Sequence, residues 1–267
     1  MSRFIPSPID VPGDSGSQEL RSLLERNLSR VLTRIGANVP EGGRAPELVA
    51  VTKTVSSEVT LALVDVMVAR GLTPHLAENR ADRFEEKVLA FEAAGVRPRW
   101  HFIGHIQRNK ARRILERADV LHSVDSLRLA ETVVRIAEEL ERDVEVFIEV
   151  NLTGETEKHG LLAAGVPEVL EVLAASPQVQ VAGLMAMGPA RDLRTVDEVF
   201  FEIAALARDL ELQSPDLLSG GKCRLSMGMS GDLEAALQHG SRFVRIGSAL
   251  FEDLNLASPP SPRPADR

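Results

Sequence analysis

One lysine stands out as a residue that could do covalent chemistry. Lys53 ends the segment ELVAVTKTV, whose apolar run from Leu48 to Val51 is typical of a buried parallel strand. The chain has five lysines against 26 arginines, and the other four fall in helical or loop stretches. Such a lysine either extends into solvent, which is the common case, or lies desolvated against an apolar surface and can form a Schiff base with an aldehyde. The surrounding residues must decide between the two.

Two segments near the carboxyl end predict a place for an anion. LSMGMSGDLEAAL has Ser226 at a strand end and a helix start near Ser230, which we expect to cap that helix. VRIGSALF opens another turn at Gly247 and Ser248. Free backbone amides and the positive end of a helix favour phosphate at such loops, although ordinary turn glycines would look the same. A lysine facing a phosphate site would suit a phosphorylated aldehyde.

An alternation of strands and helices would position these residues. After a helix from Ser17 to about Ile35, we expect eight strands, each followed by a helix or helical turn, at 47–55, 75–78, 99–103, 120–124, 144–150, 179–187, 224–229 and 243–246. This pattern predicts an α/β fold with a parallel sheet closed into a (β/α)₈ TIM barrel, and an open doubly wound sheet is the alternative. The carboxyl ends of barrel strands meet on one face, where we expect Lys53, Asn79, Gly104, Asn151, Ser226 and Arg245.

Composition limits the class of protein. The 267 residues suit one barrel of about 250 residues. We expect a single domain over 17–252, with a tail at 1–16 and a proline-rich tail at 253–267. A net charge of −8 disfavours nucleic-acid binding. The single cysteine, Cys223, excludes an internal disulfide and suits the cytoplasm, and the lack of a long apolar run argues against membrane association.

Three other signals are weaker. The basic segment QRNKARRILER (107–117) could contact an acidic partner or RNA, but a solvated helix face is the expected interpretation. His101 and His105 lie four apart, yet Gly104 at a strand end removes the helical face that a zinc pair would need. We expect both to be core or pocket histidines. Lys158, in GETEKHG, is either solvated or a second aldehyde contact.

The order of short motifs resembles that of the pyridoxal phosphate homeostasis proteins (the YggS/PROSC group), whose fold is similar to the amino-terminal barrel of alanine racemase. The resemblance covers roughly residues 20–252. One departure is Ala77, because many relatives have FGEN where this chain has LAEN. The matching motifs are AVTKTV (50–55), AENR (77–80), WHFIGHIQRNK (100–110), HSVDS (122–126), EVNLTGETEKHG (149–160), GLMAMGP (183–189) and LSMGMSGDLEAALQHGSRFVRIGSALF (225–251).

This resemblance implies a barrel of the fold type III class of pyridoxal phosphate (PLP) proteins, without their second β domain. It implies that Lys53 forms the internal aldimine with pyridoxal 5′-phosphate and that Arg245 faces the pyridine nitrogen. Ser226, Gly247 and Ser248 would help hold the phosphate. Asn79 would line the pocket near the ring, and we expect His101 near the ring as well.

The implied function is a carrier of PLP in intracellular homeostasis, and not an enzyme. Arginine cannot take the proton that a strong electron sink requires, and the chain contains no tyrosine, the second acid/base group that the racemases supply. We expect a monomer that delivers PLP to PLP-dependent apo-enzymes. The alternatives are a Schiff-base aldolase acting on a sugar phosphate, with Glu78 or Asp125 as proton relay, and a weak amino-acid racemase.

Overall fold

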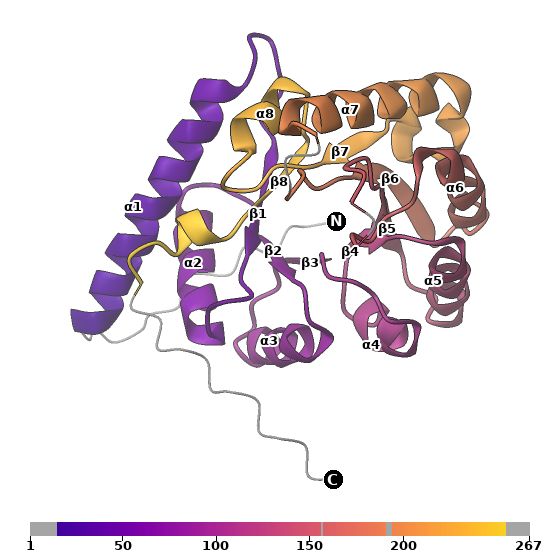
Figure 1. Ribbon diagram of the computed structural model, residues 1–267. Coiled ribbons are helices and arrows are strands. Elements are labelled where there is room, and N and C mark those ends of the chain that lie inside the picture. The colour runs from indigo at the N-terminus through magenta and orange to yellow at the C-terminus, as the bar shows by residue number, and fades with distance from the viewer. Residues whose placement is uncertain (1–14, 156, 191–193, 255–267) are drawn as a thin grey trace.

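Eight parallel strands form a closed barrel in the order in which they occur in the chain (Figure 1). The computed structural model describes residues 15–155, 157–190 and 194–254. Val49 of β1 lies opposite His75 of β2 on one side and opposite Arg245 of β8 on the other, which closes the ring. The predicted barrel is therefore confirmed, and the open doubly wound sheet is wrong. The strands are β1 Glu47–Val51, β2 His75–Glu78, β3 Arg99–Phe102, β4 Val120–Val124, β5 Val144–Glu149, β6 Val179–Met185, β7 Arg224–Ser226 and β8 Phe243–Ile246.

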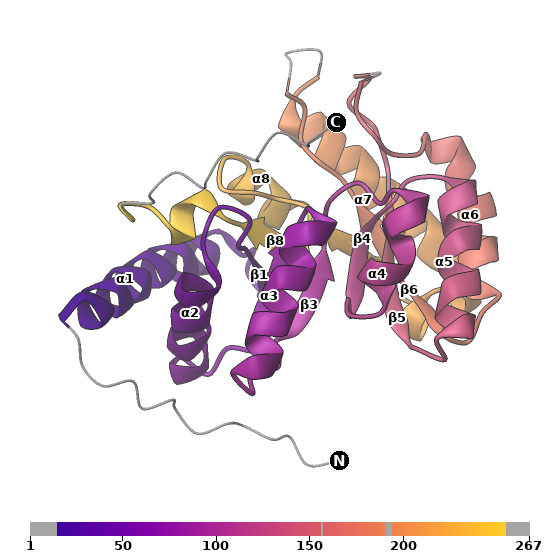
Figure 2. The same ribbon diagram turned by 90° about the horizontal axis from the view of Figure 1, so that it is seen from below.

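Helices surround the barrel, and a long first helix lies outside the ring. Figures 1 and 2 both show α1 running beside α2, and α1 also contacts α8. The helices are α1 Ser15–Asn38, α2 Ser57–Ala69, α3 Ala81–Ala93, α4 Ala111–Leu115, α5 Leu127–Glu139, α6 Val166–Ala174, α7 Val196–Gln213 and α8 Leu233–Gln238. Short 3₁₀ turns are η1 Arg108–Lys110, η2 Ala163–Gly165, η3 Pro215–Leu217, η4 Ser219–Gly221 and η5 Ser248–Leu250.

Side-chain caps explain where several helices begin. The Ser56 hydroxyl accepts a hydrogen bond from the Val59 amide at the start of α2, and Ser126 does the same for α5. The prediction that Ser230 caps the helix after β7 is wrong. That helix, α8, begins at Leu233 with Asp232 in the N-cap position, so Ser230 is left in the preceding loop.

The alternation of side chains along the strands separates two apolar regions. Leu48 and Ala50 face the surrounding helices, in the large core between sheet and helices. Val49 and Val51 face the inside of the barrel. β1 ends at Val51, and Lys53 lies in the turn that follows, at the carboxyl end of the barrel.

The basic segment at 107–117 is neutralised by neighbouring helices. Arg112 pairs with Glu139 of α5, and Arg117 donates a hydrogen bond of 2.9 Å to Glu92 in α3. Exposed ion pairs of this kind contribute only about 0–1 kcal/mol each, but they reduce the positive charge of this face. The segment therefore forms a partly paired helix surface.

The tails were predicted at 1–16 and 253–267. Residues 15 and 16 belong instead to α1, which begins at Ser15, two residues earlier than expected, and residues 1–14 and 255–267 lie outside the described part of the chain. Within the described ranges, every helix is too short or too polar to cross a membrane.

Candidate functional site

The carboxyl ends of the strands surround a cavity of about 660 Å³. Five of the seven predicted site residues line it: Lys53, Asn79, Arg245, Gly247 and Ser248. The remaining wall combines the polar residues Thr54, Ser230 and Gly231 with the apolar residues Val51, Ile103, Met185, Met187, Met229 and Phe251. A second hollow, of about 440 Å³, lies at the amino-terminal end of the barrel. Active sites of this fold occur at the carboxyl-terminal face, so the first cavity is the candidate site.

Lys53 reaches this cavity with its amine uncommitted. Within the described residues, Lys53 makes no hydrogen bond or ion pair, whereas Lys87, Lys158 and Lys222 are each paired with a carboxylate. Lys53 is nevertheless exposed, so the desolvated environment considered from the sequence is not present in this structure. The lysine is a free primary amine at the wall of a partly apolar cavity.

A buried ion pair fixes the turn that carries Lys53. The Lys87 Nζ donates hydrogen bonds of 2.5 Å to the Glu78 carboxylate and to the Thr52 carbonyl, and the Thr52 hydroxyl donates to the same Glu78 oxygen at 2.7 Å. Glu78 has no exposed surface and lies between the barrel and α3. Burial lowers the pKa of Lys87, and the adjacent Glu78 opposes that shift. Glu78 is therefore a structural partner of Thr52, and its suggested role as proton relay for Lys53 is wrong.

Arg245 forms the base of the cavity. Its side chain is 5% exposed and donates hydrogen bonds of 2.7 Å to the Ser226 hydroxyl and 3.0 Å to the Ala186 carbonyl. Burial lowers the pKa of Arg245 to about 10, against the opposing influence of Asp232 and Glu149. The guanidinium therefore stays positively charged at neutral pH and is held in one orientation.

A chain of histidines inside the barrel continues from Arg245. The Ser226 hydroxyl bonds His122 at 2.8 Å, His122 bonds His101 at 2.8 Å, and His101 bonds His75 at 2.8 Å. His75 ends 3.6 Å from the Glu47 carboxylate.

Only one direction of hydrogen bonding gives each of these groups a partner. Arg245 can only donate, so the Ser226 hydroxyl accepts from it and donates to His122. Each histidine then donates through its Nε2 hydrogen, and the last hydrogen, on His75, points to Glu47. All three histidines are neutral in this arrangement. Burial accordingly lowers the pKa of His75 and takes the pKa values of His101 and His122 well below 6.5.

The structure does not bring Ser226 or His101 to the cavity wall. Both have no exposed surface, and their polar atoms are committed to the histidine chain. A direct contact of Ser226 with a phosphate, or of His101 with a ring in the cavity, would require these bonds to break. Their place in the structure is to support Arg245 from below.

Two turns on one side of the cavity form a cradle suited to an anion. The Ser248 hydroxyl, at the start of η5, lies 3.1 Å from the Ser230 hydroxyl in the β7–α8 loop. Gly247 lies so close to β1 that a Cβ there would be 3.2 Å from the Val51 carbonyl oxygen. Arg34 of α1 fixes the loop from outside, because it donates 2.6 Å hydrogen bonds to the Ser230 carbonyl and to Glu234. Hydroxyls and main-chain amides in adjacent turns are typical phosphate ligands.

Asn79 is placed by a close approach between two strands' ends. A Cβ on Gly104 would lie 1.9 Å from the Asn79 carbonyl oxygen, so only glycine fits there. Asn151 was also expected at the mouth of the barrel, but its side chain stabilises the loop that follows β5 instead. Its amide nitrogen donates to the carbonyls of Glu155 and Lys158, at 3.0 and 3.2 Å.

That loop also determines the role of Lys158. Its Nζ lies 2.5 Å from Glu155 and donates a 2.8 Å hydrogen bond to the Gly188 carbonyl. Lys158 therefore links two loops, and the suggestion of a second aldehyde contact is not supported.

Nearby, Glu149 at the end of β5 is 4% exposed. Its pKa is raised to about 7, mainly by burial and further by Asp125, while Arg245 opposes the shift.

Sequence reasoning missed two features of the site. Ser230 lines the cavity, although its position before a helix suggested a cap. Ile103 and the methionines of the cavity wall were not predicted either, because no sequence pattern distinguishes them from other apolar residues. The histidine chain had a weak signal, because His75, His101 and Ser226 each fall on the inward row of a strand.

Comparisons with known proteins show the family and the fold of this chain. Residues 22–254 match the model of the alanine racemase N-terminal domain family. A pyridoxal phosphate homeostasis protein from Vibrio alginolyticus is 34% identical over 237 residues, which are 86% of this chain and 97% of that protein. The structure of PipY from Synechococcus elongatus with PLP bound superposes with a TM-score of 0.71 at 30% identity, covering 85% of this chain and 99% of PipY.

Alanine racemase from Clostridium difficile shares the fold, with a TM-score of 0.64 at 16% identity, but this chain covers only 59% of it. The match is therefore confined to the barrel part of that enzyme. The chain belongs to the alanine racemase N-terminal domain family and, within it, to the pyridoxal phosphate homeostasis proteins.

Proposed function

We propose that the protein binds pyridoxal 5′-phosphate in the cavity at the barrel mouth and takes part in PLP homeostasis as a carrier. The observation that carries this proposal is the placement of one free amine, Lys53, and the serine and glycine turns at Ser230 and Gly247 on the wall of a single cavity. PLP has an aldehyde, an aromatic ring and a phosphate, and the cavity offers a separate group for each. In PipY, at 30% identity, the same fold contains PLP.

The donor groups fit the cofactor as follows. Lys53 would hold the aldehyde carbon covalently but reversibly, and Ser230, Gly247 and Ser248 would hold the phosphate. Asn79 and the methionine side chains would surround the ring. Arg245 would face the pyridine nitrogen, with Ser226 and the buried histidines keeping its guanidinium in position. When bound, PLP supplies an electron sink for amino-acid chemistry.

The same residues favour holding the cofactor over turnover. Lys53 and Arg245 are the titratable side chains on the described cavity wall. Arg245 stays charged and cannot take up a proton from a ring nitrogen, so it would keep the ring neutral. Racemisation needs acid/base groups on both faces of the substrate, and a second such group is absent from this wall. We therefore propose a carrier that exchanges PLP with apo-enzymes, with weak racemisation at most.

The aldolase alternative has less support. It needs a proton-relay carboxylate beside the amine, but Glu78 is bound to Lys87 and Thr52, and the described cavity wall contains no carboxylate. Asp125 hydrogen-bonds His105 at 3.0 Å and is not part of this wall.

Borohydride reduction of the purified protein followed by peptide mapping tests the proposal. We expect an absorbance band near the visible edge that reduction abolishes, and a phosphopyridoxyl label on Lys53. Lys53→Ala should lose band and label, whereas Lys158→Ala is the matched control that removes a mouth lysine outside the cavity wall. Label on Lys158, or a colourless protein trapped only by a sugar phosphate, would contradict the proposal.

Delivery is tested separately by mixing the loaded protein with a PLP-dependent apo-enzyme and following the recovered activity. We expect faster reconstitution than from Lys53→Ala mixed with the same total PLP. We also propose that the protein acts as a cytoplasmic monomer, which light scattering and cell fractionation can check.

A further inference from the structure

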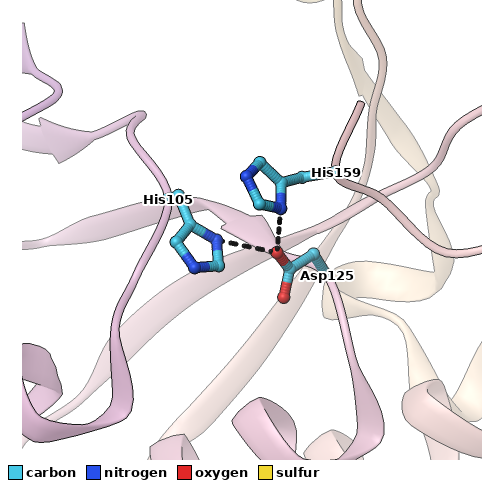
Figure 3. Close-up of side chains that lie close together, drawn as sticks. All are labelled: His105, Asp125 and His159. Atoms are coloured by element: carbon cyan, nitrogen blue, oxygen red, sulfur yellow. Dashed lines mark hydrogen bonds and ion pairs between the residues drawn. The ribbon is translucent and has the colours of Figure 1, made fainter. Parts of the chain in front are cut away.

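Two histidines from separate loops converge on one carboxylate at the rim of the barrel. Asp125 directly follows β4, His105 follows β3, and His159 lies in the loop between β5 and η2 (Figure 3). The Asp125 Oδ2 lies 3.0 Å from the His105 Nδ1 and 3.7 Å from the His159 Nδ1. All three ligand atoms fall within 4.8 Å of one another.

These separations match the requirements of a metal centre. Bonds of about 2.0–2.2 Å in a tetrahedral site place neighbouring donor atoms about 3.3 Å apart. The measured 3.0 and 3.7 Å lie on either side of that value. The imidazole rings stack with centroids 4.1 Å apart and planes 14° from parallel, and both Nδ1 atoms face the Asp125 carboxylate (Figure 3). An imidazole nitrogen binds a metal ion in the plane of its ring, so the two exposed rings would turn out of this stack to bind one ion together.

The charge balance also favours a cation. The Asp125 side chain is only 9% exposed, and within the described residues its ion-pair partners are the two histidines, which carry no permanent charge. Lysine and arginine, which neutralise most buried carboxylates of this protein, do not pair with Asp125 in the described structure. Two stacked imidazoles that were both protonated would repel each other, whereas neutral imidazoles are metal ligands.

The surrounding backbone holds the ligands in place before any ion binds. Asn151 accepts hydrogen bonds from Thr153 and donates to the carbonyl of Lys158, the residue before His159. Gly160, with φ of +117°, follows His159, and a Cβ there would lie 2.8 Å from the Asn151 nitrogen. The residues on both sides of His159 are therefore held against Asn151, just beyond the end of β5.

We propose that His105, Asp125 and His159 form a binding site for a divalent transition-metal ion, with Zn²⁺ as the best-fitting ion. Two imidazole nitrogens and a carboxylate suit Zn²⁺, Co²⁺ or Ni²⁺, whereas Mg²⁺ and Ca²⁺ prefer oxygen ligands alone. Three protein ligands leave a fourth coordination position for water or for an anionic group of a small molecule. This site is separate from Lys53 and does not depend on the proposed binding of PLP.

Calorimetry of the tag-free, chelator-treated protein with ZnCl₂ tests the site, and the visible absorption of Co²⁺ provides a second readout. We expect one ion per chain, no comparable binding of Mg²⁺, and Co²⁺ bands of a low-coordinate site. His105→Asn and His159→Asn should each weaken Zn²⁺ binding by at least about 10-fold, since loss of a ligand costs no less than loss of a supporting partner. The double variant should lose it.

His239→Asn is the matched control, because His239 pairs with Asp197 at 2.8 Å without a third ligand. It should bind Zn²⁺ like the unmodified chain, and so should Lys53→Ala. Absence of Zn²⁺ binding, or equal affinity in the His105→Asn/His159→Asn double variant and in His239→Asn, would overturn the proposal. Circular dichroism of the exposed-histidine variants establishes that the fold is retained.

Discussion

Acidification should destabilise this fold between pH 6.5 and 5.5, through the three histidines inside the barrel. Burial lowers the pKa of His75 and takes those of His101 and His122 well below their ordinary value of 6.5. All three therefore bind fewer protons in the folded state than in the unfolded chain once the pH falls below about 6.5, and His101 and His122 stay neutral in the folded state. The contribution of these histidines to the free energy of unfolding is therefore complete above pH 6.5 and is lost as the pH falls below it.

The magnitude follows from proton linkage. Over this pH unit His101 and His122 should each remove about 1 kcal/mol from the free energy of unfolding, and His75, whose pKa is also lowered, should remove at most about as much again. Glu149 acts in the opposite direction, because its pKa is raised from 4.5 to about 7 and the folded state gains its proton first. It should add about 1 kcal/mol over the same interval. The expected net loss is about 1–2 kcal/mol, a sizeable part of a typical stability of about 5–15 kcal/mol.

Urea denaturation followed by the fluorescence of Trp100 measures this loss. Trp100 is the single tryptophan, is buried, and packs edge-on against Phe84 and Phe91. A chelator removes any contribution from bound metal. Glu149→Gln should increase the loss of stability by about 1 kcal/mol, because the opposing contribution of Glu149 disappears. A stability that is flat or rises from pH 6.5 to 5.5, or a shallower dependence in Glu149→Gln, would refute the reasoning.

Three further predictions concern the groups that shape the cavity. Lys87→Met should cost about 3–5 kcal/mol in urea denaturation, because Glu78 would remain buried without its counter-ion. Gly104→Ala should cost about 1–3 kcal/mol and lower the melting temperature, since the added Cβ would overlap the Asn79 carbonyl. Arg34→Ala should free the Ser230 loop, cost about 1–2 kcal/mol, and weaken the binding of inorganic phosphate measured by calorimetry.

Each of these has a matched control in the same chain. Lys222→Met removes a lysine that is 71% exposed and should change stability by less than about 0.5 kcal/mol. Adding Glu78→Leu to Lys87→Met should recover much of the loss, and a double variant as unstable as the single would contradict the charge argument. Gly36→Ala has open space around its Cβ and should be neutral or stabilising. Arg30→Ala removes an exposed pair with Glu252 and should leave phosphate binding unchanged.

The barrel could be predicted because its signal is local and repeated. The apolar run from Leu48 to Val51 is a signal within a few residues, and an apolar strand followed by a helix or helical turn recurs along the chain. Strand ends were less predictable, since β7 ends at Ser226 where three more residues were expected. Their lengths depend on pairing with neighbours far away in the sequence.

The residues of the candidate site likewise fall into some whose position the sequence predicts and some whose position it does not. Lys53, Asn79, Arg245, Gly247 and Ser248 follow from being at or beyond the carboxyl ends of strands, and the cavity contains all five. Ser226 and His101 also point into the barrel, but they lie below the cavity. The alternation of side chains predicts which face of a strand a residue occupies, but not how far down the barrel it lies. Depth depends on barrel shear and on the size of the residues above, which only the closed sheet defines.

The sequence by itself determined the order of strands and helices, the inward face of each strand and the presence of one lysine at a strand end. Those are properties of backbone geometry and side-chain alternation, which act between near neighbours. The tertiary structure decided that Glu78 neutralises Lys87, that Ser226 joins three histidines to Arg245, and that His105, Asp125 and His159 meet. These contacts join different strands and loops, and closure of the barrel, which is driven by burial of its apolar surface as a whole, sets their distances.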